Sequence, residues 1–189
     1  MAKGEYNRVF GWFRVGLVYA VLLALVIRSR PTPLSVSIGF FIMALGEVLR
    51  IWAAGHLVKT AELVTSGPYR YTRNPLYLGR LLIFSGLAIA AVLPYHLQWA
   101  VLGLGWLVFF GYYLRRKEQV EPARLREVHG EAYERYHEAV PALFPKLMPY
   151  SASTARGWSS HRATLNREHW MAIGLLVLNL YLLWRSYHP

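Results

Sequence analysis

A polar segment between two apolar stretches contains most of the side chains in this sequence that could bind a ligand. It covers residues 65–79 and reads Thr-Ser-Gly-Pro-Tyr-Arg-Tyr-Thr-Arg-Asn-Pro-Leu-Tyr-Leu-Gly. Gly67-Pro68 predicts a turn whose backbone amides can face a ligand, and Arg70 and Arg73 supply permanent cations. Three tyrosines can stack on a planar ring or hydrogen-bond to it: Tyr69, Tyr71 and Tyr77. Membrane topology explains each residue singly, whereas the ordered combination indicates a binding segment.

Two carboxylates, Glu118 and Glu121, follow the fourth apolar stretch in the run Arg115–Pro122. A carboxylate at the edge of a bilayer can act as a general base, bind a ribose hydroxyl or neutralise a cation. Taken on their own, the two residues are explained better by ion pairing with Arg115 or Arg116 at helical spacing. Which of the two acids faces a site stays open at this point.

Glu47 and Arg50 lie three residues apart inside the second apolar stretch. An isolated charge at such a depth costs at least about 2.5 to 3.5 kcal/mol, so the two side chains are expected to pair or to face a polar cavity. In a cavity between helices they would contact a substrate. A mutual ion pair that only orders the helices fits the spacing as well.

Composition places the chain among membrane proteins. It has 189 residues, is 55% hydrophobic and carries a formal net charge of +11. The basic residues cluster beside apolar stretches, which favours anionic headgroups over nucleic acid as partners. With no cysteine and no HExxH motif, no metal site is predicted.

Five apolar stretches are long enough, or nearly so, to span a bilayer. We therefore predict one all-α domain over residues 1–189, a polytopic transmembrane helical bundle. The predicted spans cover about residues 9–27, 34–57, 76–93, 97–114 and 170–184.

The segment 115–168 is predicted to lie outside the membrane as an amphipathic helical cover over the mouth of the bundle. Its apolar residues recur at three- and four-residue spacing, with a break near Gly130 and a stop at Pro141. Pro122 suits the first turn of a helix. The distribution of basic residues predicts that this segment, the binding segment and the N-terminus are cytoplasmic.

Two blocks of sequence resemble the isoprenylcysteine carboxyl methyltransferase family and the related phospholipid N-methyltransferases. The first block is Gly67-Pro68-Tyr69-Arg70-Tyr71 followed by Arg73-Asn74-Pro75-Leu76-Tyr77-Leu78-Gly79. The second is Glu121 followed by Gly130-Glu131-Ala132-Tyr133-Glu134-Arg135-Tyr136, which ends in Val140-Pro141. The resemblance covers about residues 35–145.

This resemblance implies an integral membrane enzyme that binds S-adenosylmethionine without a Rossmann fold and methylates a lipophilic substrate that enters from the bilayer. It implies catalytic roles for Arg73 and Glu121, with Glu47 and Arg50 on the substrate side. The residues expected to bind the cofactor are Gly67, Pro68, Tyr69, Asn74, Pro75, Tyr77, Gly79, Tyr133 and Tyr136.

The chain departs from the family pattern at two positions. Asn74 stands where the family usually has histidine, and Pro122 replaces the second glutamate of a usual pair. Asparagine can hydrogen-bond but cannot titrate, so no proton transfer is expected at position 74.

Four functions are compatible with these residues. The first is methyl transfer to a carboxylate of a prenylcysteine-like or other lipophilic substrate, which needs positioning and no strong base. The second is N-methylation of a phospholipid or another amine, for which Glu118 or Glu121 would be the base. The third is an NADPH-dependent reductase of the sterol type, and the fourth a non-enzymatic membrane component.

Overall fold

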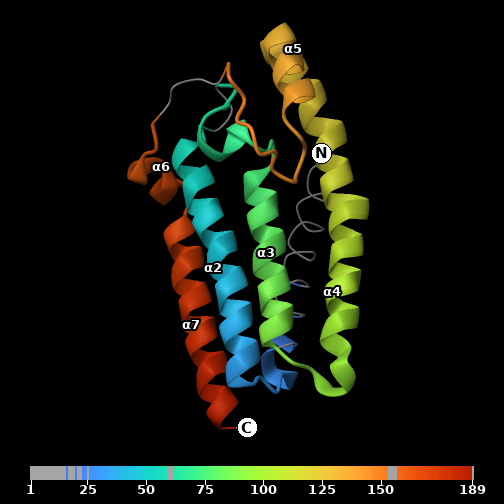
Figure 1. The fold of residues 1–189 in the computed structure, drawn as a ribbon, viewed down its shortest axis with the longest axis vertical. Coiled ribbons are helices and arrows are strands. Elements are labelled where there is room, and N and C mark those ends of the chain that lie inside the picture. The colour runs from blue at the N-terminus through green and yellow to red at the C-terminus, as the bar shows by residue number, and fades with distance from the viewer. Residues whose placement is uncertain are drawn as a thin grey trace, which may run out of the picture.

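All the regular elements in the described part of the chain are helical, which confirms the all-α prediction. The computed structural model describes residues 16, 20, 23, 24, 26–58, 62–152 and 157–188, apart from the side chains of residues 121, 123 and 124. Its elements are α2 (Pro33–His56), η1 (Gly67–Arg70), α3 (Pro75–Ala90), η2 (Pro94–His96), α4 (Leu97–Val108), η3 (Phe109–Leu114), α5 (Arg115–Ala139), α6 (Ser160–Leu165) and α7 (Glu168–Tyr187) (Figure 1).

Three of these helical stretches are long and apolar enough to cross a membrane. They are Pro33–His56, Pro94–Val120 and Glu168–Tyr187, which correspond to the predicted second, fourth and fifth spans. The predicted third span corresponds to α3, an apolar helix of only 16 residues. Most of the predicted first span, at 9–27, falls outside the described residues. The transmembrane helical bundle is therefore confirmed, and three of the five predicted spans have the length and hydropathy that a span needs.

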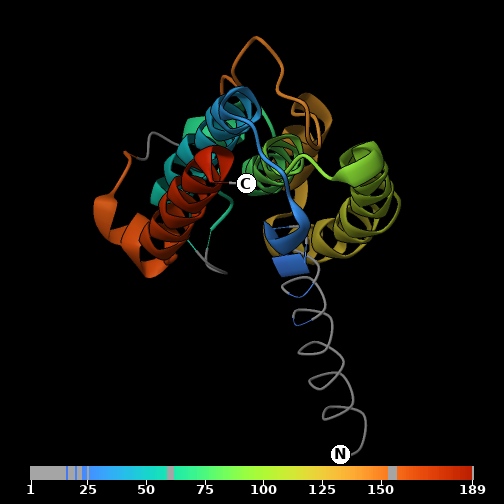
Figure 2. The same cartoon turned by 90° about the horizontal axis from the view of Figure 1, so that it is seen from below.

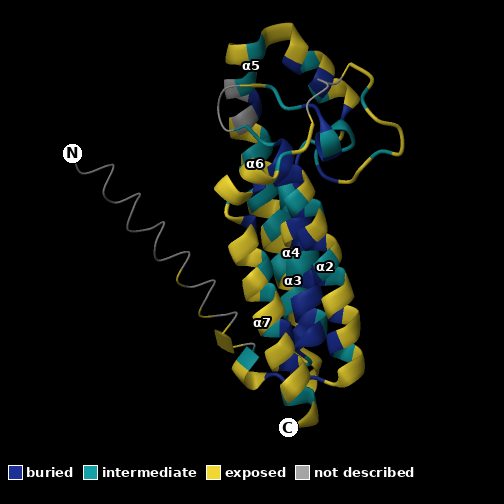
Figure 3. Ribbon diagram, turned by 90° about the vertical axis from the view of Figure 1, so that its left-hand side faces the viewer, coloured by how far each residue is buried: buried dark blue, intermediate teal, exposed yellow. Residues whose placement is uncertain are grey.

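Helices α2 and α3 are antiparallel and pack unusually closely because glycines face each other at two levels. A methyl group on Gly39 would overlap the carbonyl oxygen of Gly86, and one on Gly46 would lie 2.7 Å from the carbonyl oxygen of Gly79. Small residues at such positions let helix backbones approach within a membrane. Seen along the helix axes, α3 lies between α2 and α4 (Figure 2), and the inward sides of the helices are buried (Figure 3).

Polar contacts join α6 and α7 to the end of α2. Arg50 donates to both carboxylate oxygens of Glu168, at 2.9 and 2.8 Å, and its Nε lies 3.6 Å from a carboxylate oxygen of Glu47. Three side chains from the α6 region donate to carbonyls in the last turn and a half of α2: Trp158 to Ile51, Arg162 to Gly55, and Asn166 to Ala54. The bond to Gly55 satisfies one of the last four carbonyls of α2, which a helix end leaves without an intrahelical partner.

The long helix that follows η2 corrects one prediction. It runs from α4 through the π-helical stretch η3 into α5 without a break before Gly130, so Pro122 lies inside α5 and not in a first turn. Proline there removes one backbone donor without ending the helix. The predicted break at Gly130 is confirmed, because this glycine has φ 50° and ψ −129° in the middle of α5. The helix ends at Ala139, before Pro141.

The glycine contact yields the first prediction. Gly39→Ala should destabilise the protein by about 1 to 3 kcal/mol because its methyl group must displace the backbone of α3. Gly103→Ala is the matched control, since open space surrounds Gly103 in α4 and alanine is the better helix former. Thermal unfolding in detergent should give a lower melting temperature for the first variant only. Equal melting temperatures would contradict the close contact.

Candidate functional site

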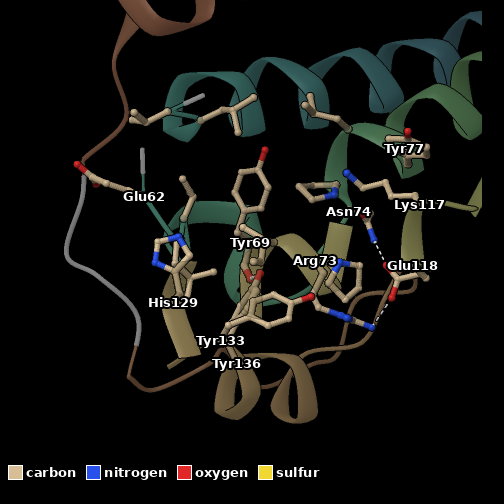
Figure 4. A pocket seen from close by; sticks show the side chains of 18 of the residues that line it. Glu62, Tyr69, Arg73, Asn74, Tyr77, Lys117, Glu118, His129, Tyr133 and Tyr136 are labelled. Atoms are coloured by element: carbon tan, nitrogen blue, oxygen red, sulfur yellow. Dashed lines mark hydrogen bonds and ion pairs between the residues drawn. The ribbon is translucent and has the colours of Figure 1, made fainter. Parts of the chain in front are cut away.

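A cavity of about 400 Å³ opens where the α2–α3 connection meets α5 (Figure 4). Its wall comes from the loop after α2, from η1 and the start of α3, and from both halves of α5. The volume lies within the range that small-molecule sites occupy. A second hollow of about 410 Å³ adjoins it, because Glu62, Leu63 and His129 line both.

The turn at the start of the binding segment has a conformation that favours glycine. Gly67 has φ +58°, and a methyl group there would overlap the ring of His56 at the end of α2. The His56 ring in turn lies 3.0 Å from the hydroxyl oxygen of Ser66. The turn is thus fixed against α2, which sets the position of the residues that follow it.

Tyrosines from the second half of α5 hold the binding segment in place. The hydroxyl group of Tyr136 donates to the carbonyl oxygen of Tyr69 at 2.8 Å, and Tyr133 and Tyr136 are both buried beside Val140. Burial, reinforced by neighbouring Tyr69, raises the pKa of Tyr136 above its usual range, so the phenol keeps the proton that it donates. Burial also lowers the pKa of His137, with Arg73 acting in the same direction.

An ion pair and an amide fix one carboxylate at the cavity wall. Arg73 lies 2.7 Å from one carboxylate oxygen of Glu118, and the Asn74 amide donates to the other at 2.7 Å. The same amide nitrogen donates to the carbonyl oxygen of Ala142 at 2.9 Å. Both hydrogens of the amide are therefore used, and the amide positions the Glu118 carboxylate.

These contacts identify Glu118 as a cavity residue. Glu121 belongs to the same helix, but its side chain lies outside the described residues, so its predicted catalytic role stays a prediction.

The segment after α5 runs back along the binding segment and braces it. Backbone amides donate from Arg73 to Pro141, from Lys146 to Tyr71 and from Tyr150 to Arg70. The hydroxyl group of Thr72 also donates to the carbonyl oxygen of Leu143 at 2.8 Å. Residues 70–74 are thus fixed by backbone bonds from a segment about seventy residues further along the chain.

Two cations at the cavity were missed by the sequence reasoning. The guanidinium of Arg80 and the amine of Lys117 lie 5.3 and 4.8 Å from the centre of the Tyr77 ring. They come from α3 and α5, and both line the cavity. The spacing of Tyr77 and Arg80 along one helix could have signalled the first contact. Nothing local signals the second, because Lys117 lies forty residues away.

The structure brings most of the predicted site residues to the cavity wall. These are Tyr69, Arg73, Asn74, Pro75, Tyr77, Tyr133 and Tyr136. Gly67 and Pro68 lie behind the wall in η1, and Gly79 packs against α2, with Arg50 beside it. Glu47 and Arg50 are also outside the wall, in the buried cluster with Glu168, and their substrate role stays a prediction. Within the described residues no group of three or more His, Cys, Asp or Glu could hold a metal ion.

Comparison with known proteins gives one family and two named relatives. A family model described as phospholipid methyltransferase (PEMT) matches residues 34–131, more than half of the chain. The cobalt-zinc-cadmium resistance protein CzcN of Cupriavidus metallidurans is 29% identical over 165 residues, which cover 84% of this chain and 72% of that protein. The nickel-cobalt-cadmium resistance protein NccN of Alcaligenes xylosoxydans xylosoxydans is 27% identical over 113 residues, 59% of this chain and only half of that protein. No solved structure matches significantly.

The amide at position 74 yields a prediction with a defined pH dependence. Asn74→Asp sets a second carboxylate against Glu118 and the Ala142 carbonyl oxygen, and two adjacent carboxylates do not both ionise without cost. Such a pair binds protons more tightly in the folded state, so the lost stability should return as pH falls toward about 4, where free carboxyls protonate.

Thermal unfolding of the variant and the original protein at pH 5 and pH 8 measures this effect. The difference in melting temperature between Asn74→Asp and the original protein should be larger at pH 8 than at pH 5. The double variant Asn74→Asp/Glu118→Gln is the control, because it exchanges the amide and the carboxylate between the two positions. At pH 8 its melting temperature should lie closer to that of the original protein than the melting temperature of Asn74→Asp does. A difference independent of pH would contradict the proximity of the two side chains.

Proposed function

The chain belongs to the phospholipid methyltransferase family and is a membrane methyltransferase, and from this premise we propose that its cavity binds S-adenosylmethionine and delivers the methyl group to a lipophilic acceptor. The observation that carries the proposal is the convergence of Arg73, Asn74 and Glu118 with four tyrosines on one cavity of about 400 Å³. This convergence joins both blocks of the sequence resemblance in one site.

The donor set fits a cofactor that carries a planar base, a ribose and a positive sulfur. Tyr69, Tyr77 and Tyr133 present aromatic rings, which stack on a base and attract a cation at their faces. Glu118 accepts hydrogen bonds from ribose hydroxyls or neutralises a cation. Arg73 adds a buried Nε with no hydrogen-bond partner among the described residues, a donor available for an acidic group. When bound, the cofactor supplies an electrophilic methyl group.

The chain's own residues then act mainly by positioning. Arg73 and Asn74 hold Glu118 in one orientation, so it can orient a ligand without reorganising when the methyl group is transferred. The tyrosines and the apolar side chains of Leu57, Leu63 and Leu76 limit water at the site. A displacement at methyl carbon proceeds better where the nucleophile is poorly hydrated.

A carboxylate is the acceptor that this arrangement supports best. It needs no base, and Arg80 and Lys117 at the Tyr77 ring provide positive charge beside the cavity. An amine acceptor, as in phospholipid N-methylation, is the alternative and would need Glu118 or Glu121 to take a proton. The family membership favours both methyl transfers over an NADPH-dependent reductase.

Cofactor binding can be tested without knowing the acceptor. Isothermal titration of the purified protein in detergent with S-adenosylhomocysteine should show saturable binding. Glu118→Gln should weaken it about tenfold or more, since a hydrogen bond to a charged group contributes about 1.5 to 3 kcal/mol. Glu131→Gln, a fully exposed acid on the same helix, is the matched control. The proposal would be wrong if protein that unfolds cooperatively released no heat on titration with S-adenosylhomocysteine. It would also be wrong if NADPH, and not S-adenosylhomocysteine, protected the protein against thermal unfolding.

The acceptor can then be identified by its chemistry. Protein incubated with methyl-labelled S-adenosylmethionine and a lipid extract should label a lipid fraction. Mild base releases labelled methanol from a methyl ester and leaves an N-methyl group in place. A volatile label supports the carboxylate acceptor, and a base-stable label supports the amine.

The names of both relatives describe those proteins as metal resistance proteins. We propose that this chain contributes to metal resistance through methylation at the cavity. Expression in a sensitive bacterial host should then raise the inhibitory concentration of cobalt, zinc or cadmium. Glu118→Gln should abolish the increase, while Glu131→Gln should keep it. Equal resistance from the Glu118→Gln variant would disconnect the site from metal resistance.

A further inference from the structure

Three large apolar side chains are exposed on a short loop between α5 and α6. The loop covers residues 144–148 and reads Phe-Pro-Lys-Leu-Met. Phe144 is 66% exposed, Leu147 98% and Met148 80%. Exposed apolar side chains in a contiguous group mark a contact surface, and this group lies outside the cavity.

The loop has a defined position. Its backbone is bonded to the binding segment within and just after the exposed group, from Lys146 to Tyr71 and from Tyr150 to Arg70. Thr72 and Asn74 satisfy the carbonyl oxygens of Leu143 and Ala142 just before it. These bonds lower the cost of placing this stretch of backbone at a membrane boundary, because a polar group that is bonded to protein does not need water.

The ring of Phe144 reaches the level of a membrane span. It stacks on the ring of Phe110 at 6.3 Å, and Phe110 belongs to the apolar helical stretch Pro94–Val120. Arg115 and Arg116 follow on the same helix, which places headgroups near their level. Phe110 is five residues before Arg115, about 8 Å along the helix axis. The ring that Phe144 contacts therefore lies on the hydrocarbon side of these basic residues.

The loop also extends sideways from the bundle. Seen along the helix axes, the connection that contains it passes beyond the outline of α2 and α3 (Figure 2). The one charged residue of the loop does not oppose contact with lipid. The Lys146 amine turns back to donate to the carbonyl oxygen of Ala139, at the end of α5, at 2.7 Å.

We propose that the 144–148 loop is a second membrane-contact site of this protein, separate from the spans, with bilayer lipid as its partner. Phe144 enters the hydrocarbon beside Phe110, and Leu147 and Met148 rest in the interfacial layer. The loop is continuous with the segment that bonds to Arg73 and Asn74. The bilayer surface thereby holds one wall of the cavity in place.

The absence of cysteine allows a direct test by single-site labelling. Phe144→Cys and Leu147→Cys are labelled with an environment-sensitive fluorophore, and the full chain is placed in phosphatidylcholine nanodiscs. Quenching by lipids with a spin label on the acyl chain is compared with quenching by aqueous iodide. Leu107→Cys, 69% exposed within α4, marks a lipid-facing position, and Glu131→Cys, exposed on α5, marks a water-facing one.

The label at position 144 should follow the Leu107→Cys control, with at least twofold more lipid quenching than the Glu131→Cys control. The label at position 147 should be quenched best by a spin label at the headgroup. Iodide quenching at both positions equal to that of the Glu131→Cys control would overturn the proposal. So would labels at both positions that neither quencher reaches, since that result points to a protein partner. None of these outcomes depends on methyl transfer or on cofactor binding.

Discussion

Gly39 faces Gly86 and Gly46 faces Gly79 across α2 and α3, and this contact sets the position of the α2–α3 connection that forms one side of the cavity. Two helices whose backbones touch at two levels cannot slide or rotate without steric overlap. The ends of α2 and α3 are therefore fixed relative to each other. The connection between them, with the turn at Gly67, is stretched over one end of the pair and presents Arg73 and Asn74 toward α5.

The bundle contains two groups of paired charges, one buried between helices and one at the cavity. The Glu47–Arg50–Glu168 cluster is buried between α2 and α7, where removal of one partner leaves an uncompensated charge. The Arg73–Glu118 pair lies at the cavity and is partly exposed. The first cluster ties a terminal helix to the glycine-packed pair. The second joins α3 to α5 and orients a carboxylate toward a ligand, so it is the pair on which the proposed chemistry depends.

Several features were readable from local sequence because their causes are local. Apolar length predicted α2, α4 and α7, and Gly130 and Pro141 predicted the break and the end of α5. Pro122 was misread, because a proline can sit inside a helix that the preceding span has already nucleated. The partner of Arg50 was missed as well. Glu168 lies 118 residues away, and no local pattern reveals such a contact.

The sequence by itself determined the helical membrane class, the family and the segment that carries the site, because these depend on composition, periodicity and local order of residues. Only the tertiary structure decided that Glu118 joins the cavity wall, that Arg80 and Lys117 share the Tyr77 ring, and that Gly79 serves helix packing. These choices depend on which faces of α3 and α5 meet. That meeting is fixed by the glycine contact and by hydrogen bonds from residues 141–150, between groups far apart in the chain.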